Sequence, residues 1–173
     1  KPVSVELGLQ TIHEETARYI RRGYDAEVYY DAVRRLKAAG LDVVTHIILG
    51  LPGENAEMAR ETTRQVVAAG SDGVKFHLLH VLRGTDLERD YLDGKFTVYE
   101  REEYLDLLRE CLEHLDPSVV IHRMTGDGPA ELLIAPLWAS RKREVLNLLH
   151  HQMKEKGSFQ GKIFCDFSEK ADK

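Results

Sequence analysis

The chain has 173 residues and a formal net charge of −5, and 43% of its residues are hydrophobic and 31% are charged. This balance is typical of a globular protein, and the length suits a single domain. No apolar run approaches the roughly 18 residues that cross a bilayer, so we expect no membrane partner and a cytoplasmic protein. The net acidity argues against broad non-specific binding to nucleic acid.

The cysteines and the start of the chain give two further expectations. Cys111 and Cys165 lie far apart and form no CxxC pair, which predicts reduced thiols rather than a disulfide framework or a cysteine-rich metal site. The chain begins at Lys1 and enters an apolar stretch almost at once. We therefore expect the natural N-terminus to lie further upstream.

The pattern in the first half of the chain predicts two repeats, in each of which a strand is followed by one or two helices. Apolar runs indicate strands at 3–9 and 43–49, and helical spacing indicates helices at 14–22, 27–39 and 56–69. In the second of these helices Tyr29, Val33 and Leu36 share one face, and Gly40 supplies a C-terminal stop. This is the pattern of repeated β-α units.

The second half continues the alternation after a polar insertion. We expect a strand at 73–81, the insertion at 84–99, a helix with a leucine stripe at 101–115, a strand at 119–123, a turn at 126–129 and a helix at 141–156. Residues 158–164 are expected to add a small edge strand. Residues 165–173 form a charged tail that is expected to be disordered.

Strands that are nearly all apolar, each followed by a helix, predict an α/β fold with a parallel sheet covered on its outer face. Right-handed crossovers curl four such units into a partial (β/α) barrel. Four units do not close a barrel of six or eight strands, so the outer strands present open edges. We expect residues 1–164 to be the C-terminal part of a larger barrel. The alternative is that the tail and a second copy of the chain cover the edges in a homodimer.

The strand that ends at Leu49 runs into a glycine-proline turn, and such strand ends carry ligand sites in α/β enzymes. His46 shares a pleat side with Ile48 and Gly50, which places it inside a barrel near the carboxyl rim. Gly50 and Pro52 belong to a tight turn that lets a ligand approach the backbone. The alternative for His46 is a buried histidine satisfied by a backbone carbonyl.

Polar side chains in or after other strands are further candidates. Gln10 can hydrogen-bond a ribose hydroxyl or a carboxylate, and Arg22 can bind a carboxylate in a bidentate manner; both can equally be surface residues. Glu6 is an acid within an apolar strand and needs a partner or a function. Arg123 ends a strand just before a turn, where it either meets a ligand or braces the turn in an ion pair.

The sequence contains no recognisable metal-ligand pattern. His77 and His80 are three residues apart on one expected strand, so they are expected to face opposite sides and not to share a metal. His13 begins no HExxH zinc motif, and the patterns GxxxxGK[ST] and GxGxxG are absent. These features argue against a zinc enzyme and against a nucleoside-triphosphate hydrolase.

Several consecutive motifs, in the same order, resemble the second half of the radical S-adenosylmethionine (SAM) enzyme core, to about Phe164. The motifs are Glu6-Leu7-Gly8-Leu9-Gln10-Thr11, Arg22-Gly23, His46-Ile47-Ile48-Leu49-Gly50-Leu51-Pro52-Gly53-Glu54, Lys75-Phe76-His77-Leu78-Leu79-His80-Val81, Arg83-Gly84-Thr85, His122-Arg123-Met124-Thr125-Gly126-Asp127-Gly128 and Ala135-Pro136-Leu137-Trp138. They are most similar to an uncharacterised bacterial radical SAM family. That family is related to the oxygen-independent coproporphyrinogen dehydrogenases and the Elongator-type tRNA-modifying catalytic subunits.

This resemblance implies the C-terminal part of a TIM-like (β/α)6 barrel whose strand ends bind SAM. Polar residues would contact its ribose and amino-acid portion, turn residues would border the adenosyl group, and residues after the third strand would line the adenine pocket. The implied SAM contacts are Gln10, Arg22, His46, Gly50, Pro52, Leu79 and Val81. The implied substrate-side residues are Glu6, His80 and Arg123. No residue of this chain is expected to bind a metal.

One departure from the family pattern concerns iron. Radical SAM enzymes bind a [4Fe-4S] cluster through a CxxxCxxC loop, because three thiolates leave one iron open to chelate SAM. That loop is absent from this sequence, and neither Cys111 in the leucine stripe nor Cys165 in the tail replaces it. We therefore expect a C-terminal portion of a longer enzyme, produced by truncation or proteolysis and inactive alone.

In the full-length enzyme, the resemblance implies a [4Fe-4S] cluster reduced by a donor such as flavodoxin or ferredoxin. SAM would be cleaved to a 5′-deoxyadenosyl radical that acts on an unknown substrate, tRNA or a small molecule. The alternative is a non-catalytic SAM- or nucleoside-binding or interaction module derived from such a barrel. A third interpretation is a SAM- or phosphate-binding barrel enzyme without iron.

Overall fold

Strands and helices alternate along the chain in the computed structural model, which describes residues 3–126 and 128–164. The strands are β1 (Ser4–Gln10), β2 (Asp42–Leu49), β3 (Gly73–Leu78), β4 (Val81–Leu82), β5 (Val120–Arg123) and β6 (Leu133–Ala135). The helices are α1 (Glu14–Tyr19), α2 (Ala26–Ala38), α3 (Ala56–Ala68), α4 (Asp86–Leu92), α5 (Arg101–His114), η1 (Leu137–Ser140) and α6 (Lys142–Glu155). Each strand and helix expected before residue 157 is therefore present, with ends that differ by a few residues.

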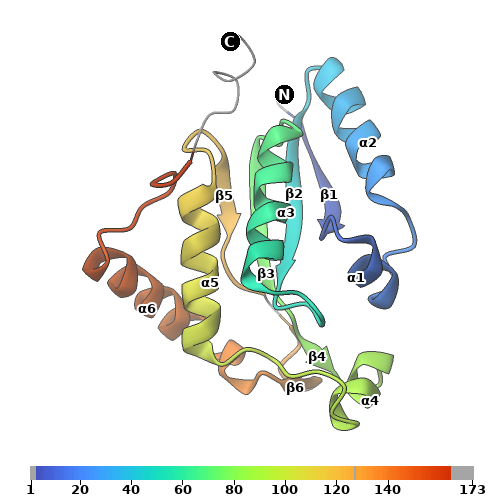
Figure 1. Cartoon of the computed structure of the whole chain (residues 1–173), viewed down its shortest axis with the longest axis vertical. Helices are drawn as coiled ribbons and strands as arrows, with labels where there is room; N and C mark the ends of the chain where they lie inside the picture. Colours follow the sequence, from blue (N-terminus) through green and yellow to red (C-terminus); the bar gives the residue numbers. More distant parts are fainter. Residues whose placement is uncertain (1–2, 127, 165–173) are drawn as a thin grey trace.

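β1, β2, β3 and β5 form one parallel sheet in chain order, as successive β-α units predict. Helix α2 packs on β1 and β2, α3 packs on β2, and α5 packs on α3, so the helices cover one face of the sheet (Figure 1). The strands run in the same direction, and their carboxyl ends point to the side of the molecule that carries α1, β4 and β6 (Figure 1).

The residues of each strand alternate between two faces with different chemistry. The helix-facing positions of β2 and β3 are buried: Val43, Thr45, Ile47, Leu49, Val74, Phe76 and Leu78. The positions between them form what we call the inner face, which carries four polar side chains that are only partly buried or exposed: Glu6, His46, Lys75 and His77. The inner face also carries the apolar residues Val44 and Ile48. The strands are therefore less uniformly apolar than expected, because only one face of the sheet is covered by helices.

The leucine stripe of α5 packs in the core, as its spacing predicts. Leu105, Leu108 and Leu112 are at most 4% exposed, and burying each contributes roughly 1.5–3 kcal/mol. The helix begins with a capping box in which the Glu103 carboxylate accepts a hydrogen bond from the Glu100 backbone N–H at 2.9 Å. None of the helices in the described part of the chain has the length and apolar character of a membrane-spanning segment.

The segment after β3 differs from the expectation. The third strand ends at Leu78, and Val81 instead belongs to β4, which pairs antiparallel with β6. The polar insertion contains α4, whose first turn is capped by Thr85: its Oγ1 accepts from the Glu88 backbone N–H at 3.2 Å. The β4–β6 pair and α4 therefore lie beyond the carboxyl ends of the main sheet (Figure 1).

The end of the described chain also differs. Residues 158–164 form turns rather than an edge strand. The Gln160 amide donates to the backbone carbonyls of Asp116 and Val119 at 2.7 and 2.8 Å, which holds the segment against the loop that precedes β5. The charged tail 165–173, including Cys165, and Asp127 of the expected turn lie outside the described residues.

Candidate functional site

Gln10 ends β1 in a conformation that places its amide over the strand. Its φ is 64°, in the left-handed region, and the pairing of β1 with β2 shifts register between Gly8 and Gln10. Such a conformation costs a non-glycine residue about 1 kcal/mol or more and is concentrated at functional sites. A Cβ at Gly8 would lie 2.5 Å from Gln10 Nε2, so the glycine leaves the space that the amide occupies.

The turn after β2 is tied to the loop after β1. Gly50 and Gly53 have φ of 81° and 82°, which side chains rarely adopt. Glu54 accepts a hydrogen bond from Thr11 Oγ1 at 2.6 Å. Thr11 is fully buried, and burial raises the pKa of the Glu54 carboxyl. The two loops therefore form one connected rim at the carboxyl edge of the sheet.

Two adjoining hollows of about 410 and 360 Å³ lie along this rim and share Gln10, Ile48 and Leu79. Both volumes are within the roughly 300–1,000 Å³ typical of small-molecule sites. The larger one, here called the apolar hollow, is also lined by Leu51 and Leu87. The smaller one, here called the polar hollow, is lined by imidazole and guanidinium groups.

The structure brings most of the residues singled out from the sequence to these hollows. Six of them line one or both: Gln10, Arg22, His46, Leu79, His80 and Arg123. The other four lie nearby without lining either one: Glu6, Gly50, Pro52 and Val81. Glu6 bonds His46, Gly50 packs under the Tyr99 ring, Pro52 borders a separate hollow, and Val81 is fully buried.

Arg22 lies at the wall of the apolar hollow, but protein groups already bind its guanidinium. The side chain is 1% exposed and donates to the Glu14 carboxylate at 3.0 Å. It also donates to the backbone carbonyls of Leu9, Thr11 and Tyr24 at 3.1, 2.6 and 2.7 Å. Arg22 therefore fixes the end of β1 and positions Tyr24, whose ring centroid is 5.0 Å from the guanidinium carbon.

Four inner-face side chains form a connected set of hydrogen bonds, here called the inner array: Glu6, His46, Lys75 and His77. Lys75 Nζ donates to both Glu6 oxygens at 2.6 Å, and His46 Nε2 lies 2.7 Å from Glu6 Oε2. His46 Nδ1 lies 3.2 Å from His77 Nε2, and the two rings are within 20° of parallel. Hydrogen bonds from Lys75 and His46 lower the pKa of Glu6 to about 2. Burial, then nearby positive charge, lowers the pKa of His77 to about 4.

Lys75 and His77 were not singled out from the sequence as site residues. Their positions opposite His46 and Ile48 follow from the cross-strand register of β2 and β3, which no local pattern specifies. The sequence pattern that could have identified Lys75 and His77 is the presence of polar residues at alternate positions of an otherwise apolar strand. The expectation that His77 and His80 face opposite sides was wrong, because β3 ends between them and both line the polar hollow.

Within residues 3–126 and 128–164, no group of three or more His, Cys, Asp or Glu side chains is arranged to hold a metal ion. Cys111 is fully buried in α5, and burial raises the pKa of its thiol to about 12. An iron–sulfur cluster requires thiolates. The described residues therefore do not fit such a cluster, whereas the amide and aliphatic groups of the rim do fit a nucleoside.

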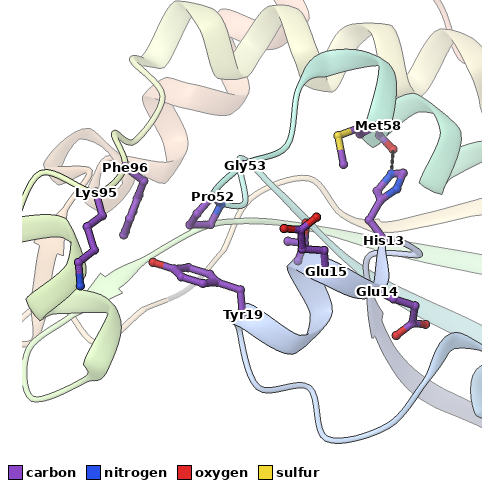
Figure 2. A pocket seen from close by; sticks show the side chains of 10 residues that line it. His13, Glu14, Glu15, Tyr19, Pro52, Gly53, Met58, Lys95 and Phe96 are labelled. Carbon is purple, nitrogen blue, oxygen red and sulfur yellow. Dashed lines mark hydrogen bonds between the residues drawn. The ribbon is translucent and has the colours of Figure 1, made fainter.

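A separate hollow of about 570 Å³ lies beside the same turn (Figure 2). Pro52 and Gly53 border it on one side, Glu15 and Tyr19 come from α1, and Phe96 comes from the segment before α5 (Figure 2). The described residues that line it include no member of the inner array. We therefore place the candidate site at the apolar and polar hollows.

A parallel sheet with helices on one face and ligand hollows at its carboxyl edge defines the chain as part of a (β/α)-barrel core. The family described as Radical SAM superfamily matches residues 1–66, and the one described as Radical_SAM C-terminal domain matches residues 71–155. The chain belongs to the radical SAM superfamily, as its motifs indicated, and its sheet is part of the barrel of that superfamily.

Three known proteins show how far the similarity extends. Uncharacterized protein YtqA of Bacillus subtilis is 42% identical over 96% of this chain and 52% of its own length. A tRNA uridine(34) acetyltransferase of Methanocaldococcus infernus is 28% identical over 88% of this chain and 29% of its own. The solved structure of M. infernus Elp3 with an N-terminus deletion has a TM-score of 0.80 at 26% identity, over 91% of this chain and 37% of that one. The chain spans about half the length of the first curated relatives that it matches.

Proposed function

We propose that the two hollows form the SAM-binding wall of a radical SAM enzyme of which this chain is one part. The observation that carries the proposal is the meeting of Gln10, Ile48 and Leu79 at the carboxyl edge of the sheet, in a chain of this superfamily. An amide beside a broad apolar wall suits SAM, because its ribose and amino-acid portion hydrogen-bond while its adenine presents an aromatic face.

The apolar hollow is proposed to take the adenosyl part of SAM. Ile48, Leu51 and Leu79 offer aliphatic surface that packs on adenine and excludes water, and Gln10 offers a donor and an acceptor to the ribose or carboxylate. Arg22 supports this wall indirectly, because its donors are committed to backbone carbonyls and Glu14.

The polar hollow is proposed to face the substrate, and His46, His80 and Arg123 line it. When SAM is bound, it supplies the 5′-deoxyadenosyl group with which enzymes of this superfamily abstract hydrogen. We propose that cysteines outside this sequence bind the [4Fe-4S] cluster and that a flavodoxin or ferredoxin reduces it. The substrate is proposed to be tRNA or a small molecule, and the name of the relative tRNA uridine(34) acetyltransferase supports tRNA.

The test is SAM binding to the anaerobically reconstituted full-length protein, measured by isothermal titration calorimetry. Gln10→Asn keeps a residue that tolerates the left-handed backbone but withdraws the amide from the hollow. We expect SAM affinity to fall by about 0.5–1.5 kcal/mol, the usual contribution of one hydrogen bond.

Gln65→Asn is the matched control, since Gln65 lies on α3 and donates to Glu61. We expect this variant to bind SAM like the parent protein. Absence of SAM binding by the parent, or equal losses in both variants, would contradict the proposed site. SAM binding by a full-length protein that takes up no cluster would favour a non-catalytic SAM-binding module.

A further inference from the structure

The hydrogen bonds of the inner array determine which imidazole nitrogens carry protons. The Glu6 carboxylate only accepts, so His46 Nε2 carries the proton that it donates across 2.7 Å. In a neutral ring His46 Nδ1 is then an acceptor, and the 3.2 Å contact requires a proton on His77 Nε2. His77 Nδ1 is left with a lone pair, and no hydrogen bond joins that atom to any of the described residues.

His77 lines the polar hollow, so this lone pair belongs to a residue of the substrate-facing wall. We propose that His77 Nδ1 is a general base for a substrate with a weakly acidic O–H or N–H group, that His46 accepts the proton displaced from His77 Nε2, and that Glu6 is the counter-ion of His46. This role goes beyond the proposed SAM site. It concerns the polar hollow and holds whether or not SAM binds in the apolar one.

The transfer balances within the inner array. The O–H or N–H bond of the substrate breaks and leaves its electron pair on the oxygen or nitrogen, while an N–H bond forms at His77 Nδ1. His77 Nε2 passes its own proton to His46 Nδ1 across the 3.2 Å contact. The products are a substrate anion and an imidazolium at His46, and the reverse sequence returns the proton. No electron acceptor is required.

The charges around the array favour this final position of the proton. The titratable or positive groups that face the His77 ring come from β2, β3 and the segments after β3 and at the end of β5: His46, Lys75, His80 and Arg123. A positive charge on His77 is therefore disfavoured, and its pKa lies near 4. His46 instead lies against the Glu6 carboxylate, which stabilises the imidazolium. Relay thus moves the charge to the ring that has a counter-ion.

The first test reads the tautomers directly. In full-length protein labelled with ¹⁵N-histidine and studied without SAM at about pH 7, we expect His77 to carry its proton on Nε2 and none on Nδ1. His46→Gln and His77→Gln variants assign the signals. A proton on His77 Nδ1 would overturn the proposal, because that nitrogen would then have no lone pair with which to accept a proton.

The second test measures the reactivity of that lone pair. Diethyl pyrocarbonate acylates unprotonated imidazole nitrogens, and mass spectrometry resolves the rate at each site. At about pH 5.5 a free histidine added as reference is roughly 90% protonated and reacts slowly. We expect His77 to stay reactive, because a group with a pKa near 4 remains neutral at this pH.

Two variants show whether the acylation rate of His77 depends on proton transfer to His46 or only on the exposure of the His77 ring. Acylation at His77 Nδ1 releases the Nε2 proton to His46, so Glu6→Gln should slow it about threefold, the scale of a partly exposed ion pair. Glu57→Gln makes the same change on α3, where Glu57 pairs with Arg60 and Arg64, and should leave the rate unchanged. Loss of His77 reactivity at the lower pH, or equal rates in Glu6→Gln and the parent, would overturn the proposal. Failure of SAM binding would leave these results unaffected.

Discussion

At the scale of single residues, His77 couples the stability of the protein to pH. Its pKa is lowered from 6.5 to about 4 on folding, first by burial and then by positive neighbours. Between these values the unfolded chain binds a proton that the folded chain does not. Neutral His77 therefore makes its full contribution to the free energy of unfolding above about pH 6.5, and this contribution is lost as the pH falls towards 4.

We expect His77→Gln to flatten this part of the pH profile. Full linkage is discounted because the ring is only partly buried, so the parent should lose about 1–2 kcal/mol more unfolding free energy than the variant between neutral pH and about pH 4. Urea denaturation of both full-length proteins at the two pH values measures the difference. Parallel profiles would show that His77 takes up its proton equally in the folded and unfolded states.

Residues at strand ends were accessible to sequence reasoning, and residues paired across strands were not. Gln10 and His46 could be predicted because an apolar strand stops beside them, and parallel strands end at a common edge. The partners of Glu6 could not be predicted, because Lys75 is brought to it by pairing through β2. Likewise, the hydrogen bonds from the Arg22 guanidinium to backbone carbonyls depend on the conformation of a loop, which no local sequence pattern predicts.

At the scale of the elements, α3 begins directly after the rim turn, and its first turn has a side-chain cap. Asn55 Oδ1 accepts from the Met58 backbone N–H at 3.0 Å. We expect Asn55→Ala to lower the unfolding free energy by about 1 kcal/mol, because the Met58 backbone N–H loses its side-chain acceptor. Urea denaturation measures the loss.

Asn147→Ala is the matched control for this cap. Asn147 lies exposed within α6, where alanine has the higher helix propensity, so the change should be neutral or slightly stabilising. If both variants lost the same stability, the Asn55 cap would contribute nothing specific.

Long periodic elements could be predicted, and short non-local ones could not. The stripe of α5 repeats over several turns, so its spacing alone indicates a buried helix face. β4 has only two residues and is paired with β6, and Val81 meets Ala135 across more than fifty positions of sequence. A two-residue strand has no periodicity to detect. The same holds for the turns at 158–164, which the Gln160 side chain stabilises.

At the scale of the whole molecule, the helix layer and the ligand hollows lie on opposite sides of the sheet. Cys111 belongs to the helix layer, where it is completely buried. We expect Cys111→Ala to leave the iron content and SAM affinity of the reconstituted full-length protein unchanged, because its thiol reaches neither hollow. Iron analysis and calorimetry check this, and a loss of iron in the variant would show that α5 contributes to the cluster.

The alternation of the two strand faces also has an evolutionary consequence. Phe76 fills the core behind the sheet, whereas its neighbours Lys75 and His77 project from the other side. Mutations at the projecting positions can change the chemistry of the inner face without opening a void among the leucines of α5. The inner face can therefore vary in evolution at every second residue, while the intervening residues keep the scaffold folded.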